Sequence, residues 1–87
     1  MSRELKTTVR EFANSISEND LMFVTTRLAD RFSGDMAEGL NFLSKNRSID
    51  GMLSSARSAD DFYDLLDVVI ETLRQECDKK NLFGNAA

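Results

Sequence analysis

The chain contains no proline in its 87 residues, and its apolar side chains recur at intervals of three and four positions. Proline strongly interrupts a helix, and this spacing places side chains along one helix face. The first apolar stripe consists of Leu5, Val9, Phe12, Ala13 and Ile16. The longest consists of Phe62, Leu65, Leu66, Val69, Ile70, Leu73 and Cys77. The pattern therefore predicts an all-α fold.

Three positions carry the signature of a helix N-terminus, a capping residue followed three positions later by an acidic residue. They are Ser17, Asp35 and Ser58. We predict helices over about 3–16, 18–33, 35–46 and 58–80, and a short helical turn over 48–56 that contains Gly51. Gly84 is the predicted terminator of the last helix, with a frayed tail over 84–87. The expected fold is a compact bundle of four main helices plus the short turn, the last helix being the longest, in one domain over 1–87.

The size of the chain indicates self-association. A chain this short buries a modest fraction of its surface, and its single cysteine, Cys77, cannot form an intrachain disulfide. Pairing of two chains would enlarge the apolar core that each chain can build alone. We therefore expect a homodimer.

The absence of histidine excludes several kinds of chemistry. Histidine is the usual acid–base residue near neutral pH and a common metal ligand, and a lone cysteine cannot supply a thiolate zinc site. Serine–histidine and cysteine–histidine nucleophiles are excluded for the same reason. We expect no catalytic, cofactor-binding or metal-binding residues and no enzymatic activity. Cys77 lies in an apolar stripe, so we interpret it as a small core residue.

No apolar run reaches the roughly 20 residues that span a bilayer. The first residues, MSRELKTTVREF, carry charges of both signs and lack the apolar core of a secretory signal. These observations predict no membrane association and a cytoplasmic location.

The stretch LADRFSGDMAEGLNFL, residues 28–43, has the outline of a helix-turn-helix. In a DNA-binding version the second helix enters the major groove, yet here that helix opens with Asp35 and Glu38. The nearby cations are Arg27, Arg31 and Lys45. Because phosphate binding needs clustered cations and the chain has a net charge of -4, nucleic-acid binding is disfavoured. We predict a corner between two helices with Gly34 in its turn, and keep a helix-turn-helix regulator using residues 21–45 as the alternative.

Several large apolar residues lie outside the stripes of their own helices. These candidate partner-binding residues are Met22, Phe23, Phe42 and Val68. A central helix in a bundle can bury two faces, which would place them inside the protein. Alternatively they form an apolar patch for another chain, since aromatic residues and methionine are enriched at interfaces.

The net charge is concentrated in the last third of the chain. Residues 1–58 contain eight acidic and eight basic residues, whereas 59–87 contain seven acidic and three basic ones. Four acids are predicted to line one helix face opposite the apolar stripe: Asp60, Asp64, Asp67 and Glu71. This face is either a solvated surface or a docking surface for a basic partner.

The function most consistent with these features is protein binding. We expect a small helical protein–protein interaction module, acting as a regulator, an adaptor or a chaperone-like subunit. Such a module would pack a helix face against another protein, and its acidic last helix would steer the approach of that partner.

Overall fold

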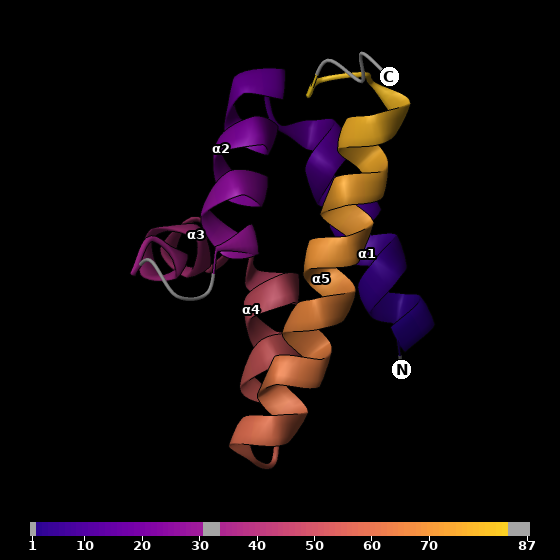
Figure 1. The fold of residues 1–87 in the computed structure, drawn as a ribbon. Helices are drawn as coiled ribbons and strands as arrows, with labels where there is room; N and C mark the ends of the chain where they lie inside the picture. The colour runs from indigo at the N-terminus through magenta and orange to yellow at the C-terminus, as the bar shows by residue number, and fades with distance from the viewer. Residues whose placement is uncertain (1, 31–33, 84–87) are drawn as a thin grey trace.

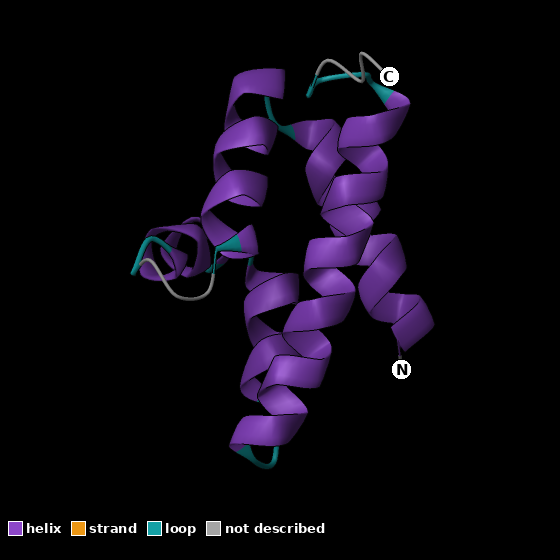
Figure 2. Ribbon diagram, in the orientation of Figure 1, coloured by secondary structure: helices purple, strands orange, loops and turns teal. Residues whose placement is uncertain are grey.

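The computed structural model describes residues 2–30 and 34–83. Over these ranges it contains five helices and no strand. Figure 2 shows the helices in purple and the loops between them in teal. The helices are α1 (Ser2–Ser15), α2 (Glu18–Ala29), α3 (Met36–Leu43), α4 (Arg47–Ser54) and α5 (Ala59–Lys79). The predicted all-α bundle with a long last helix is confirmed. In Figure 1, α1 and α2 flank the upper part of α5, and α4 lies against its lower part.

Two of the three predicted N-terminal caps form, and the third does not. The Ser17 hydroxyl accepts a hydrogen bond from the backbone N–H of Asp20 at 3.1 Å. The Ser58 hydroxyl accepts one from the backbone N–H of Asp61 at 3.1 Å. Asp35 stands at the cap position of α3, but its backbone is already helical and its side chain makes no capping hydrogen bond. The reason is geometric, because a capping side chain requires an extended backbone at that residue.

The second and third helices are shorter than predicted. Helix α2 ends at Ala29, since Asp30 leaves the helical region with φ -104° and ψ 87°; residues 31–33 of the predicted helix lie outside the described residues. Helix α3 ends at Leu43 rather than near residue 46. Asn46 instead begins the next helix, because its side chain accepts a hydrogen bond from the backbone N–H of Ile49 at 3.0 Å. Its extended backbone cannot also continue α3.

Helix α5 ends at Lys79, close to the predicted residue 80, and the residue that terminates it is Asn81. The predicted terminator, Gly84, lies outside the described residues. Asn81 adopts the left-handed conformation with φ 56°, a conformation that asparagine tolerates better than most residues. The backbone N–H of Leu82 donates to the Cys77 carbonyl at 3.0 Å, and that of Asn81 donates to the Asp78 carbonyl at 3.1 Å. This pair of bonds is a Schellman motif, and Leu82 completes it by packing against the core.

All five helices contribute to one apolar core. Its buried members are Leu5, Val9, Phe12, Ala13, Leu21, Val24, Leu28, Leu43, Ile49, Leu53, Leu66, Val69, Ile70, Leu73 and Cys77. Helix α5 packs against α1, α2 and α4, whereas α3 packs against α2. Helix α3 supplies a single fully buried apolar side chain, Leu43. Most of the remaining α3 side chains are therefore exposed or half-buried.

Candidate interaction surfaces

The structure brings together two of the predicted partner-binding residues, Phe23 on α2 and Phe42 on α3. Their ring centroids lie 5.9 Å apart, in a tilted arrangement. Phe42 also contacts Phe12 of α1 edge-on, with a centroid distance of 6.1 Å. Phe12 is buried in the core, and Phe42 and Phe23 are half-buried. Three helices thus contribute to a row of aromatic rings that runs from the core to the surface, and we call it the aromatic face.

Two cations lie over the rings of the aromatic face. The Arg27 guanidinium is 4.7 Å from the centroid of the Phe23 ring, and its Nε donates to Glu38 Oε2 at 3.1 Å. The Lys45 ammonium is 5.2 Å from the centroid of the Phe42 ring. Attraction between a cation and the electron-rich face of a ring stabilises such pairs by about 0.5–1 kcal/mol at exposed sites.

The other two apolar candidates are placed differently. Val68 lies on α5, is half-buried and packs against the core. Met22 is half-buried on α2, the helix that carries Phe23. Internal packing thus involves Val68 and Phe42 directly, so the off-stripe position of these residues does not by itself mark an interface.

The four predicted acidic candidates share an exposed position on α5. Asp60, Asp64, Asp67 and Glu71 are all exposed, and their spacing of three and four residues places them along one side of the helix. We call this row the acidic ridge. The neighbouring Asp61 belongs to the helix start instead, because its carboxylate accepts a hydrogen bond from the backbone N–H of Arg57 at 3.0 Å.

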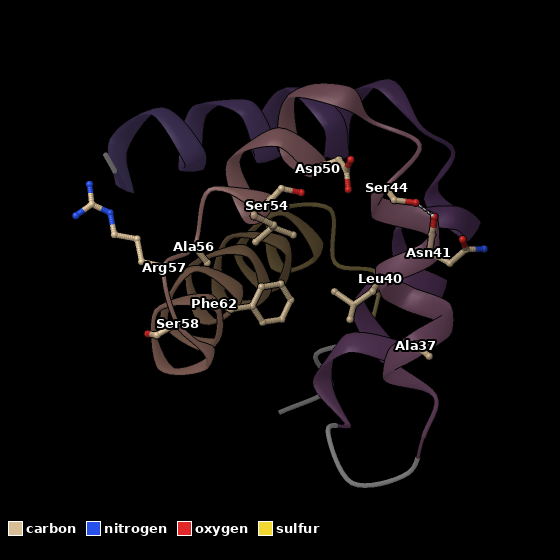
Figure 3. A pocket seen from close by; sticks show the side chains of 11 residues that line it. Ala37, Leu40, Asn41, Ser44, Asp50, Ser54, Ala56, Arg57, Ser58 and Phe62 are labelled. Atoms are coloured by element: carbon tan, nitrogen blue, oxygen red, sulfur yellow. Dashed lines mark hydrogen bonds between the residues drawn. The ribbon is translucent and has the colours of Figure 1, made fainter.

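A groove that the sequence does not reveal lies between α3, α4 and the start of α5. Its volume is about 730 Å³. The apolar part of its lining is formed by Ala37, Leu40, Leu53, Ala56 and Phe62, and its polar part by Asn41, Ser44, Asp50, Ser54, Arg57 and Ser58. Figure 3 shows Leu40 and Phe62 pointing toward each other from opposite walls, while Arg57 extends away from the groove. We call this feature the α3–α4–α5 groove.

The sequence predicts the apolar lining of this groove as ordinary core. Leu40 and Phe62 follow helical apolar stripes like any buried residue, yet both are half-buried in the structure. They remain half-buried because α3 packs mainly on α2 and α4 packs on α5, so among the described helices the side of α3 turned toward Phe62 borders a groove instead of a closely packed helix. The spacing of apolar residues in the sequence is the same whether another helix packs on the stripe or the stripe stays half-buried.

A buried carboxylate ties α1 to α5. Glu76 is 4% exposed and accepts hydrogen bonds from the Asn14 amide and from the Lys79 ammonium, both at 3.1 Å. Burial alone would raise the pKa of the Glu76 carboxyl, but the hydrogen bonds from Lys79 and Asn14 and the positive charges of Lys79 and Arg10 together hold that pKa below its ordinary value. Glu76 is therefore ionised near neutral pH and holds the two helices together.

The described residues also bear on metal binding, membrane insertion and DNA binding. Residues 2–30 and 34–83 contain no cluster of three or more histidine, cysteine or acidic side chains that could hold a metal ion. The described helices include none whose length and hydropathy would suit a bilayer. Of the arginines on which DNA binding depends, Arg27 is paired with Glu38, and Arg31 lies outside the described residues.

Comparisons of the chain with protein-family models, with curated proteins and with solved structures found no match.

Proposed function

We propose that this protein is a small cytoplasmic interaction module, without catalytic activity, that binds an amphipathic helix of another protein in the α3–α4–α5 groove. The observation that carries the proposal is the groove itself. Leu40 and Phe62 face each other across it while remaining half-buried. A concave apolar surface with a polar rim is the usual form of a helix-binding groove.

The lining of the groove suits a helix with a narrow apolar face. Apolar side chains spaced three and four residues apart on a partner helix would contact Leu40, Leu53 and Phe62. The serine hydroxyls and the Asn41 amide at the rim would remain near water or bond to polar groups of the partner. In such interfaces, a few anchors inserted in the centre supply most of the binding energy.

Charge favours a basic partner. Asp50 and Arg57 are the charged residues that line the groove, and the Arg57 side chain extends away from it. The acidic ridge adds a negative field on the same helix that supplies Phe62. Such a field raises the rate of encounter with a basic partner more than it raises affinity.

The proposal is tested with two model helices of about 18 residues, long enough to be partly helical alone. Both have the same leucine pattern, but one carries lysine and the other glutamate on its polar face. We expect the lysine peptide to shift backbone amide NMR signals around Leu40, Ser54 and Phe62, and the glutamate peptide to bind more weakly.

A matched pair of variants separates groove binding from general attraction to an acidic protein. Asp50→Lys changes a charge at the rim, whereas Asp64→Lys makes the same change on the acidic ridge. We expect Asp50→Lys to weaken binding of the lysine peptide by about tenfold, or about 1.4 kcal/mol, and Asp64→Lys to weaken it much less. Equal losses in the two variants, or no signal shifts around the groove, would show that the groove is not the binding site.

A further inference from the structure

The aromatic face has two shallow hollows, one on each side of Phe42. The first has a volume of about 270 Å³ and the second about 240 Å³. The first is lined by Phe23, Glu38, Asn41, Phe42 and Lys45, and the second by Phe12, Ser15, Ile16, Phe42, Lys45 and Asn46. The hollows therefore share two lining residues, Phe42 and Lys45.

Asn41 separates this face from the α3–α4–α5 groove. Its side chain lines both the groove and the first hollow. Leu40 belongs to the groove and Phe42 to the aromatic face, so different sides of the same stretch of α3 present the two surfaces. The aromatic face is therefore a separate site from the one assigned above.

The charges on the aromatic face differ in their pairing. Arg27 and Glu38 form an ion pair at 3.1 Å, so their charges largely cancel. Lys45 is exposed, and no carboxylate of the described residues lies within 4.0 Å of its ammonium group. The net effect is one uncompensated positive charge next to two hollows that each present aromatic rings among polar groups, on a protein whose overall charge is -4.

We propose that the aromatic face binds an acidic peptide segment of another protein. A glutamate or aspartate side chain of that segment pairs with Lys45, and an apolar side chain on each side of it enters one of the two hollows. A charge-assisted hydrogen bond from the ammonium group to the carboxylate gives the segment its register. The two apolar contacts remove the exposed parts of Phe23 and Phe42 from water.

A single-stranded nucleic acid also uses aromatic rings and cations, but it fits this face less well. Bases stack on open ring faces, whereas Arg27 lies over Phe23 and Lys45 lies over Phe42. A phosphate backbone also needs several cations along its path, and Glu38 neutralises Arg27 here. The peptide is therefore the better occupant.

The test uses capped pentapeptides of sequence Leu-Ala-Glu-Ala-Leu and Leu-Ala-Gln-Ala-Leu, titrated into isotopically labelled protein. We expect the glutamate peptide to shift the amide signals of Phe23, Phe42, Lys45 and Asn46. The glutamine peptide should bind at least about tenfold more weakly, since it lacks the charge that pairs with Lys45. Equal binding of the two peptides would contradict the proposal. The proposal would also be contradicted if a thymidine oligonucleotide shifted these amide signals and neither peptide did.

Variants at Lys45 test the residue directly. Lys45→Arg keeps the positive charge and should bind the glutamate peptide within a few fold of the unaltered protein, whereas Lys45→Glu should lose at least about tenfold. Lys6→Glu makes the same reversal at an exposed lysine of α1 that lines neither hollow, and it should have little effect. If Lys45→Glu and Lys6→Glu weaken binding equally, general charge repulsion explains the result and the site is wrong.

Asp50→Lys, which tests the groove, should leave binding of the glutamate pentapeptide to the aromatic face unchanged. The two proposals can therefore fail independently of each other.

Discussion

At the scale of single residues, two glycines in helices have opposite environments. A Cβ atom at Gly39 would lie 2.8 Å from Cγ of Leu28, which is fully buried, and 3.2 Å from Cβ of Arg27. A Cβ atom at Gly51 would meet nothing within 4 Å. Gly39 therefore permits the close approach of α3 to α2, while Gly51 only lowers the intrinsic stability of α4.

We predict that Gly39→Ala destabilises the protein by about 1–3 kcal/mol, because the methyl group must displace a packed leucine. The gain in helix propensity of up to about 1 kcal/mol offsets only part of that cost. Gly51→Ala makes the same change without a clash and should stabilise the protein by up to about 1 kcal/mol. Urea denaturation of both variants measures the difference. Equal free energies of unfolding for the two would contradict the close packing of α3 on α2.

At the scale of helices, the contact between α1 and α5 includes a buried charge. The Glu76 carboxylate is satisfied by Asn14 from the other helix and by Lys79 from its own. A buried carboxylate without such partners would be costly. The hydrogen bond between Asn14 and Glu76 therefore helps to align α1 on α5, together with the apolar contacts around it.

The lowered pKa of Glu76 makes this contact sensitive to acid. Since the folded pKa lies below the unfolded one, the stabilisation is complete above the unfolded value and is lost as pH falls through the folded value. We predict that Glu76→Gln lowers the free energy of unfolding by about 1–2 kcal/mol at pH 7, and that the deficit shrinks below about pH 4.5. Urea denaturation of both proteins, from pH 7 to below about pH 4.5, measures this difference in the free energy of unfolding. Glu71→Gln, an exposed control on the same helix, should show little deficit, and an equal deficit in both variants would contradict the role of Glu76.

At the scale of the whole molecule, the fold is elongated, with principal extents of 40 × 27 × 23 Å. Helix α5 runs along most of its length (Figure 1). The α3–α4–α5 groove and the aromatic face lie on the two sides of α3, the helix with the smallest share of the core. The two candidate surfaces thus lie where the bundle is least covered by its own helices.

The small core also supports the prediction of self-association. We predict a homodimer, with twice the 9.8 kDa mass of one chain, because pairing would cover apolar surface that one chain leaves half-exposed. Light scattering after size exclusion over a range of concentrations measures the mass. A constant mass of one chain at every concentration would make this prediction wrong and leave both surfaces open to other proteins.

Local patterns in the sequence determine the helical class, the long last helix and the caps at Ser17 and Ser58, because each depends on residues within a few positions of one another. Tertiary structure decides the meeting of Phe23 with Phe42 and the half-buried position of Leu40 on α3. An apolar stripe predicts which face of a helix is turned toward the core. Only the packing of helices that are distant in sequence decides which residues of that face are fully buried. The candidate binding sites lie where the covering is incomplete, and for that reason they are properties of the folded molecule.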